Sequence, residues 1–346
     1  MDRAPGHTTA VIPAWEKEEG QTRPSGKNTR SPGSAPSREE APRLGPFSAR
    51  SLLLLLLSAL FPVSISAQPS SLSTLEEDVR AVLDTVEGDF AVAFRSLDDT
   101  SQTLLINEHQ MFHAASTMKT PVMIELYRQA KGERFDLDDS IRVGNEFQSI
   151  VDGSTYSLTP EDDSYEKLYD HIGEKRSIRT LMREMITASS NLATNILIEK
   201  VGAERTTQTM RRYGADRIQV RRGVEDMKAY DRGLNNQTSA HDLMVISERL
   251  ARGEAVSEEA SEEMIEILKD QEYDDMIPAR LPDAVEVAHK TGWITGLHHD
   301  SGIVFVPDGP TYVLVLLSQN LEDEDAGVTA FARISRLVFD SMTQER

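Results

Sequence analysis

The β-strand patterns of this chain lie only towards its two ends, with a long helix-rich segment between them. FAVAFRSL (90–97) and TLLINEH (103–109) are short apolar runs joined by a polar turn, which predicts two paired strands. The remaining strand patterns follow the helix-rich segment: AVEVAH (284–289), GIVFVP (302–307) and TYVLVLLSQ (311–319). This order predicts one sheet built from both termini, with a helical lobe inserted between them.

Amphipathic helix patterns fill the middle of the chain and also flank the strands. STLEEDVRAVLDTVE (73–87) places Ser73 and Glu76 at capping-box spacing and puts its apolar residues on one face. The other helix patterns are SIRTLMREMITA (177–188), LATNILIEKVG (192–202), AERTTQTMRRYG (203–214), SAHDLMVISERLARG (239–253) and VTAFARISRLVF (328–339). The middle three of these five end at a glycine, which is a typical helix stop.

The stretch RSLLLLLLSALFPVSISAQ has the pattern of a secretory signal. Arg50 precedes an apolar run from Leu52 to Phe61, and small residues then lead to a cleavage site after Ala67. The alternative is a membrane anchor, but the 16 residues from Leu52 to Ala67 fall short of the roughly 20 that span a bilayer. We therefore expect a cleaved signal, a periplasmic or secreted protein, and no stable membrane anchor after cleavage.

These patterns set the expected domain organisation. The first 50 residues are rich in Pro, Gly, Ser and Arg without periodicity, which indicates a disordered extension or a start codon assigned too far upstream. The fold class is α/β (α+β), with an antiparallel sheet from both termini flanked by helices and an inserted all-α lobe. The expected parts are the extension (1–50), the signal peptide (51–67) and a catalytic domain (68–346) with an α/β lobe (68–111 and 276–346) and a helical lobe (112–275).

Charge and cysteine content exclude several classes of partner and site. The formal net charge is −20, which argues against a nucleic-acid partner. The chain has no cysteine, which excludes disulfides, thiolate metal sites, a cysteine nucleophile and a lipid anchor on cysteine. Separately from these exclusions, we expect a monomer that needs no cofactor or metal, with a small-molecule substrate in a groove between the two lobes.

FHAASTMKTPVMIEL (112–126) carries a serine and a lysine one helical turn apart in an apolar stretch. Pro121 lacks an N–H, so Ser116 belongs at or near the start of a helix, where its side chain can touch that of Lys119. A lysine in a dry groove has a lowered pKa and can take the proton of a serine hydroxyl. The alternative is a capping serine with an outward lysine, and SYEK (164–167) matches the same weak pattern.

TASSNLATN (187–195) places two serines and Asn191 between one helix and the next. Simple helix capping by Ser189 or Ser190 is the alternative to a catalytic role, and SQN (318–320) also matches Ser-x-Asn. This motif is therefore weak when taken alone.

HKTGW (289–293) lies near the end of an alternating apolar strand and is more informative. The cation of Lys290 and the hydroxyl of Thr291 can bind a substrate carboxylate. Gly292 removes a side chain, so that substrate can lie against the strand. The alternative is an ordinary turn at the end of a strand.

Together these motifs resemble the active-site set of class A β-lactamases and penicillin-binding proteins. The resemblance covers essentially the whole mature chain and implies a β-lactamase/transpeptidase-like fold. The matching positions, in chain order, are Ser116-x-x-Lys119, Ser189-x-Asn191 and Lys290-Thr291-Gly292.

The resemblance also implies a role for each matching residue. Ser116 would attack an amide carbonyl to form an acyl-enzyme, Lys119 would act as base or proton relay, and Ser189 would pass the proton to the leaving nitrogen. Asn191 would hold the amide of the substrate side chain. The remaining roles fall to Lys290 and Thr291, which would bind the carboxylate, and to the N–H groups of Ser116 and Trp293, which would form the oxyanion hole.

Hydrolysis of the acyl-enzyme needs a carboxylate that activates water, and RRGVEDMKAYDRGLNN (221–236) contains the candidates. Glu225 is the first choice, Asp226 the second, and Arg222 a clamp for the loop. The alternative is a solvated charge pair on a surface turn. The usual Arg-x-Glu of the family is Arg222-x-x-Glu225 in this chain.

Two further departures from the family concern the same loop. Ala229 stands where an asparagine is expected to help hold the water, and Ser190 removes a carboxylate that normally braces the loop. Acylation therefore looks intact, whereas deacylation is the doubtful step.

Two polar stretches remain without a role. LHHDSG (297–302) contains His298 and His299, which cannot both face one way on a strand, so we expect a polar turn or edge and no metal site. EFQSIVDGS (146–154) is compatible with a loop over a groove between the two lobes, but its pattern is not specific for one.

The sequence thus predicts a serine β-lactamase of class A type that works through a Ser116 acyl-enzyme. The first alternative is a D-alanyl-D-alanine carboxypeptidase, or another amidase or esterase of the same fold. The second alternative is a penicillin-binding sensor that is acylated and signals.

Overall fold

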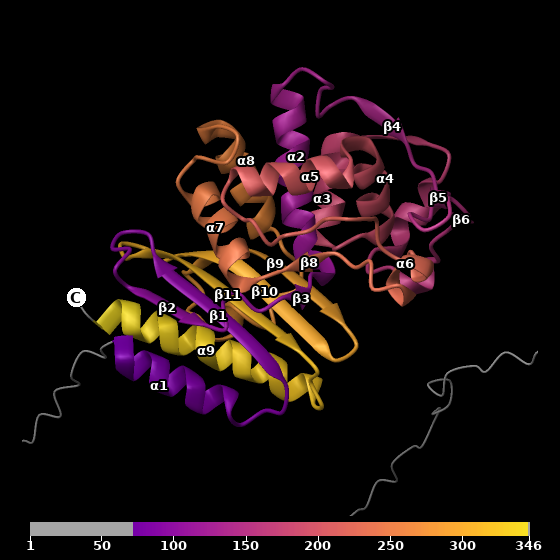
Figure 1. Cartoon of the computed structure of the whole chain (residues 1–346). Helices are drawn as coiled ribbons and strands as arrows, with labels where there is room; N and C mark the ends of the chain where they lie inside the picture. Colours follow the sequence, from indigo (N-terminus) through magenta and orange to yellow (C-terminus); the bar gives the residue numbers. More distant parts are fainter. Residues whose placement is uncertain (1–71, 345–346) are drawn as a thin grey trace, which may run out of the picture. The chain divides into compact units, whose positions relative to one another are not determined.

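The computed structural model describes residues 72–344, in which a five-stranded antiparallel sheet is covered by helices on both faces (Figure 1). The strand order is β2-β1-β11-β10-β9. The strands are β1 (Asp89–Ser96), β2 (Thr103–Ile106), β9 (Glu286–Ile294), β10 (Leu297–Phe305) and β11 (Thr311–Gln319). Because β1 pairs with β11 from Asp89↔Gln319 to Ser96↔Tyr312, both ends of the chain share one sheet, as predicted. The predicted extension and signal peptide lie outside the described residues.

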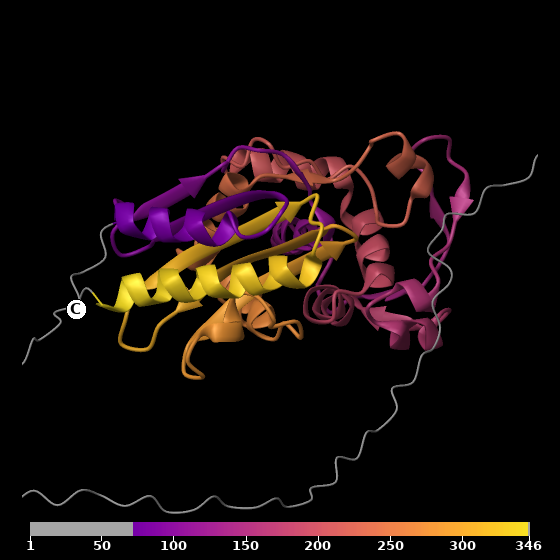
Figure 2. The ribbon, with the colours of Figure 1, turned by 90° about the horizontal axis from the view of Figure 1, so that it is seen from below.

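Two helices lie along one face of the sheet and two cover the other. The helices α1 (Leu72–Leu83) and α9 (Glu324–Gln344) lie side by side under the strands (Figure 2). The opposite face is covered by α7 (Ala240–Ala251) and α8 (Glu258–Lys269), and the sequence analysis did not single out α8. No helix within 72–344 is long and apolar enough to cross a membrane.

Alternating side chains of each strand feed two separate hydrophobic cores, because successive residues of a strand point to opposite faces. On β1, Ala91 and Ala93 pack against the helical lobe, whereas Val92 and Phe94 pack against α1 and α9. Burial at almost every position of β1 and β11 therefore reflects a sheet that is covered on both sides.

The remaining elements form the helical lobe and its connections. Its helices are α2 (Lys119–Lys131), α3 (Ile178–Thr187), α4 (Asn191–Val201), α5 (Ala203–Arg212) and α6 (Met227–Asp231). Short 3-10 helices are η1 (Ala115–Met118), η2 (Pro160–Asp162), η3 (Glu166–His171) and η4 (Pro278–Arg280). Three two-stranded pairs complete this region: β3 (Phe112–His113) with β8 (Gln237–Thr238), β4 (Ser140–Arg142) with β7 (Lys175–Ser177), and β5 (Phe147–Gln148) with β6 (Thr155–Tyr156).

The prediction of a polar turn or edge at His298 and His299 is wrong. Both residues lie in β10, an inner strand between β9 and β11. The strand accepts them because each ring finds a partner on its own side of the sheet. His298 Nε2 lies 3.0 Å from a carboxylate oxygen of Glu324, and His299 Nε2 lies 2.8 Å from the carbonyl oxygen of His113.

Candidate active site

Ser116 lies in η1, which leads directly into α2, so the serine stands at the start of a helix as Pro121 required. The Ser116 side chain is half-buried, whereas Lys119 is fully buried. The alternative of a capping serine with an outward lysine is therefore wrong. Ser164 and Lys167 of the second Ser-x-x-Lys match are both exposed.

The amine of Lys119 faces the Ser-x-Asn motif. Its Nζ donates to Ser189 O at 2.6 Å, to Ser189 Oγ at 3.0 Å and to Asn191 Oδ1 at 3.1 Å. Burial lowers the pKa of Lys119 to about 7, although the carboxylates of Asp163 and Glu225 oppose this shift. An amine that is half neutral near pH 7 can accept a proton without a large cost.

A second buried amine, that of Lys290 on β9, completes the cluster. Burial and the nearby charge of Lys119 lower the pKa of Lys290 well below its ordinary value, against the attraction of Asp300. Its Nζ donates to Thr291 O at 3.1 Å. Because Lys119 and Lys290 repel each other, an anion bound beside them would stabilise their charged forms.

Gly292 lets strand β9 approach Ser116. A β-carbon at this position would lie 2.8 Å from Ser116 N, which is closer than real β-carbons come, and 3.2 Å from Ala115 Cβ, which is a tight contact. Trp293 follows with its side chain 59% exposed. The strand thus brings Lys290 and Gly292, which share one face, against η1.

Three non-glycine residues of the site have a left-handed backbone. The φ angles are +43° at Ala115, +58° at Ser189 and +60° at Glu225. A β-carbon in this conformation costs about 1–2 kcal/mol, so surrounding contacts must hold each residue there. Backbone strain of this kind collects at functional sites, and here it marks the residue before Ser116, the serine of the Ser-x-Asn motif and the candidate base.

The loop after Val220 is anchored at its base and along its length. Arg222 donates from Nε to Leu234 O at 3.2 Å and from Nη2 to Asn235 Oδ1 at 2.8 Å, so it clamps the loop as predicted. Asp226 is buried and accepts hydrogen bonds from Ser149 Oγ, from the N–H of residue 150 and from the N–H of residue 229. These bonds fix the 146–154 stretch to the loop and occupy the second-choice carboxylate.

Glu225, the first-choice carboxylate, has a different environment. Its side chain is exposed, and no hydrogen bond to another described residue holds its carboxylate. Partial desolvation and the nearby Asp162 carboxylate raise the pKa of Glu225, while Arg222 and Lys119 oppose the shift. The charge of Lys119 therefore affects the pKa of Glu225, although no hydrogen bond to another described residue fixes the Glu225 carboxylate.

Asp163 belongs to the site, although sequence reasoning missed it. Its Oδ1 accepts the N–H of Asn191 at 2.9 Å, and its Oδ2 accepts the N–H of Leu192 at 2.7 Å. A carboxylate at a helix N-terminus is favourable, because the first N–H groups of the helix lack partners. Asp163 thus brings a carboxylate to the start of α4. It lies beside Ser190, the position at which the motif of the resembled family has a carboxylate. It lies in a polar stretch that gave no signal in the sequence.

Asn195 was also missed, but a signal for it existed. It follows Asn191 by four residues and therefore lies on the same face of α4. Its Oδ1 accepts the N–H of Val224 at 2.6 Å, and its Nδ2 donates to Val224 O at 3.0 Å. Val224, two residues after Arg222, is thus the loop residue that is fixed on α4, and Glu225 comes next.

Comparison with known proteins identifies the family. The profile of the β-lactamase enzyme family matches residues 74–342. The chain belongs to the β-lactamase enzyme family. A curated β-lactamase from Bacteroides uniformis is 22% identical over 305 residues, covering 85% of this chain and 99% of that protein.

Solved structures show that this β-lactamase family member has the β-lactamase/transpeptidase fold. A β-lactamase from Sphaerobacter thermophilus DSM 20745 matches with a TM-score of 0.66 and 24% identity, covering 79% of this chain and 98% of that one. The L158E mutant of PBP-A, solved as an acyl-enzyme complex with penicillin G, matches with a TM-score of 0.66 and 23% identity, again covering 79% and 98%.

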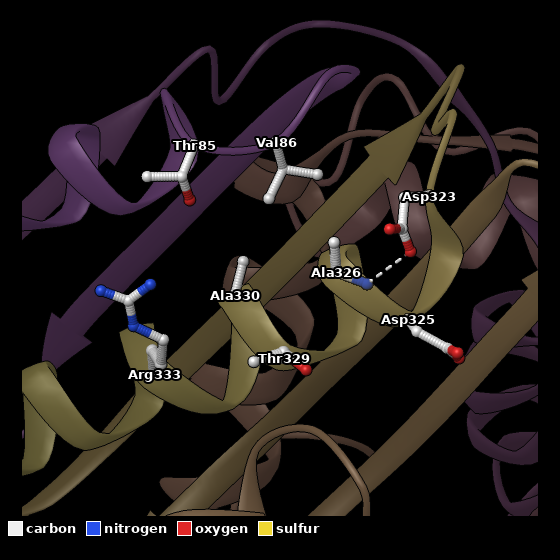
Figure 3. Close-up of a pocket in the computed structure, with 8 residues that line it drawn as sticks. All are labelled: Thr85, Val86, Asp323, Asp325, Ala326, Thr329, Ala330 and Arg333. Atoms are coloured by element: carbon white, nitrogen blue, oxygen red, sulfur yellow. Dashed lines mark hydrogen bonds between the residues drawn. The ribbon is translucent and has the colours of Figure 1, made fainter.

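A pocket of about 360 Å³ lies elsewhere in this β-lactamase family member, between the end of α1 and the first turns of α9 (Figure 3). Thr85 and Val86 line one side, and α9 residues including Arg333 line the other. Asp323 accepts the N–H of Ala326 at 2.9 Å and so caps α9. The pocket shares no residue with the site around Ser116.

Proposed function

We propose that this protein is a serine hydrolase of class A type that opens β-lactam amides through a Ser116 ester. One observation carries the proposal: the buried Lys119 amine, with a pKa of about 7, contacts Ser189 and Asn191 one helical turn from Ser116. The close approach of Gly292 to Ser116 N supports it, because the third motif then lies beside the nucleophile.

In the acylation step, neutral Lys119 takes the proton of Ser116 Oγ while Oγ attacks the lactam carbonyl. The new bond joins Oγ to the carbonyl carbon, and the amide C–N bond breaks. The 3.0 Å bond between Lys119 Nζ and Ser189 Oγ offers the path by which the proton reaches the leaving nitrogen. The N–H groups of Ser116 and Trp293 stabilise the oxyanion, each contributing about 3–4 kcal/mol.

The substrate is held by groups on both sides of the nucleophile. Lys290 and Thr291 bind its carboxylate, which also offsets the repulsion between the two buried amines. Asn191 binds the side-chain amide through its carboxamide. Gly292 leaves room for substrate to lie along β9.

In the deacylation step, Glu225 takes a proton from the water that attacks the ester carbonyl. The bond between the acyl carbon and Ser116 Oγ then breaks, and the proton returns to Oγ. A raised pKa suits a carboxylate for this task, but no hydrogen bond from another described residue holds the side chain in place. Deacylation is therefore slower than acylation, and the ester accumulates during turnover.

The second candidate is a D-alanyl-D-alanine carboxypeptidase or related cell-wall peptidase with slow lactam turnover. The apolar Val224 favours it, because this residue occupies the Arg-x-Glu spacing and has its backbone fixed by Asn195. A protein without a carboxylate at that position would release β-lactams slowly.

Two measurements test the proposal. One is the time course of hydrolysis of a chromogenic cephalosporin, and the other is mass spectrometry of the protein after a short exposure to penicillin. We expect a burst of one equivalent, an adduct on Ser116 and then continued turnover. A burst that stalls would favour the peptidase, and a protein without an adduct would contradict both candidates.

The site of action is part of the same proposal. We propose that the protein works as a monomer in the periplasm or outside the cell, after removal of the segment that ends at Ala67. N-terminal sequencing of the protein from the native host tests this point, because a mature chain that begins before Arg50 would contradict it.

A further inference from the structure

His113 lies three residues before Ser116 and is bonded to the backbone that leads to it. The N–H of Ala115 donates to His113 Nδ1 at 3.1 Å. This bond joins a side chain to the N–H two residues further on, as in an Asx turn. Ala115 is the residue with φ of +43°, so the bond supports a backbone conformation that alanine rarely adopts.

The protonation state of His113 agrees with this bond. Burial, together with the charge of Arg222, lowers the pKa of His113 to about 4, so the ring is neutral at pH 7. Because Nδ1 accepts the Ala115 N–H, the ring proton must be on Nε2. Nε2 is buried and has no partner among the described residues. The ring therefore leaves one buried group unpaired while it satisfies Ala115.

The backbone of His113 is fixed on both sides. It pairs with Gln237 of β8, and its carbonyl oxygen lies 2.8 Å from Nε2 of the fully buried His299 on β10. A rigid anchor lets the ring define where the N–H of Ala115 lies. Ala115 in turn packs against β9 where that strand lacks a side chain.

We propose that His113 is a positioning residue for acylation, which holds Ala115 in its left-handed turn and thereby aims the hydroxyl and N–H of Ser116. The proposal rests on the proposed reaction of Ser116. His113 does not touch substrate and moves no proton in the reaction. Its contribution is to keep the nucleophile and one oxyanion donor in register with β9 before substrate arrives.

Matched substitutions separate this role from simple packing. His113→Asn retains an acceptor for the N–H of Ala115. His113→Leu fills a similar volume with an apolar side chain and removes the acceptor. His113→Leu combined with Ala115→Gly removes the need for support, because glycine adopts positive φ readily. The measurement is the rate constant for labelling of Ser116 by a fluorescent penicillin, and in parallel by a fluorophosphonate.

We expect His113→Leu to slow labelling by about 10-fold to 100-fold. We expect His113→Asn to remain within about threefold of the unmodified protein and the double variant to recover most of the loss. Normal labelling of folded His113→Leu would overturn the proposal, as would an asparagine variant as slow as the leucine variant.

Two further measurements keep the test decisive. Nitrogen NMR of the unmodified protein should find the Nε2–H tautomer at His113, and the Nδ1–H tautomer would overturn the proposal even if the leucine variant fails to fold. Labelling by the fluorophosphonate but not by the penicillin would contradict the proposed substrate, and the His113 series would then be decided with the fluorophosphonate. Labelling by neither reagent would overturn both.

Discussion

Lys119 and Glu225 are the two groups proposed to accept protons, and their surroundings are opposite. Lys119 is fully buried and donates hydrogen bonds to three acceptors. Glu225 is exposed, and its carboxylate has no hydrogen bond to another described residue. The charge of each group nevertheless affects the pKa of the other.

The acylation half of the proposed reaction is therefore better organised in advance than the deacylation half. Preorganised groups in a dry site contribute most to catalysis, because no energy is spent on arranging them during the reaction. The acylation side, around Ser116, Lys119 and Ser189, meets this condition. On the deacylation side the loop is anchored by Arg222 and Asp226, but the candidate base is not.

Ser116→Ala should abolish covalent labelling by penicillin, because it removes the hydroxyl that is proposed to form the ester. Mass spectrometry after a short exposure measures the adduct. Ser164→Ala is the matched control, since it alters the other Ser-x-x-Lys match, which is exposed. Labelling of the Ser116→Ala protein would contradict the proposed mechanism.

Lys119→Ala should lower the acylation rate by about 10²–10⁴ through loss of the base. In the unmodified protein the neutral form of Lys119 increases as pH rises through its pKa of about 7. The acylation rate should therefore fall below pH 7 and reach a plateau above it. Stopped-flow labelling across pH 5–9 measures this, and a flat profile would contradict a role for Lys119 as base.

Above pH 7, where Lys119 is mostly neutral, Glu225→Gln should leave acylation unchanged and trap the ester, with deacylation slowed by up to about 10²-fold, because a general base is lost. Decay of the adduct, followed by mass spectrometry, separates the two steps. If the variant turns over normally, Glu225 is not the base.

Asp226→Asn should instead lower the melting temperature, because the Asp226 carboxylate joins the loop to the 146–154 stretch.

Val224→Glu should speed deacylation by about tenfold or more, because it places a carboxylate on the loop residue whose backbone is fixed by Asn195. Acylation should change little. Val224→Gln is the matched control without a charge. A Val224→Glu protein that deacylates no faster would show that bracing of the base does not limit turnover.

Asp163→Asn should produce the smallest effect, a shift of the acid limb of acylation to lower pH. The Asp163 carboxylate favours the charged form of Lys119, so its removal lowers the pKa of that amine further. Acylation at pH 6 should then rise by less than about tenfold. Asp162→Asn is the control, because it removes a neighbouring carboxylate that raises the pKa of Glu225. An unchanged profile with Asp163→Asn would contradict this electrostatic role.

Much of the architecture followed from local patterns. The helix at Leu72–Leu83 buries Leu75 and Val79 on the predicted face, and Ser177 caps α3 through the N–H of Thr180. Such features depend on residues within a few positions, so the sequence alone carries them. The inner-strand position of His299 could not be predicted, because it depends on a carbonyl group that lies far away in the chain.

For the site, the sequence alone identified the candidates for chemistry: a serine and a lysine at helical spacing, a Ser-x-Asn between helices, and a Lys-Thr-Gly in a strand. Which of their surroundings are dry, strained or braced depends on the tertiary structure. Burial of Lys119, the contact of Gly292 with Ser116, and the holding of Ala115 by His113 all depend on how separate segments pack. Water exclusion and backbone strain come from many distant contacts at once, and no short motif encodes them.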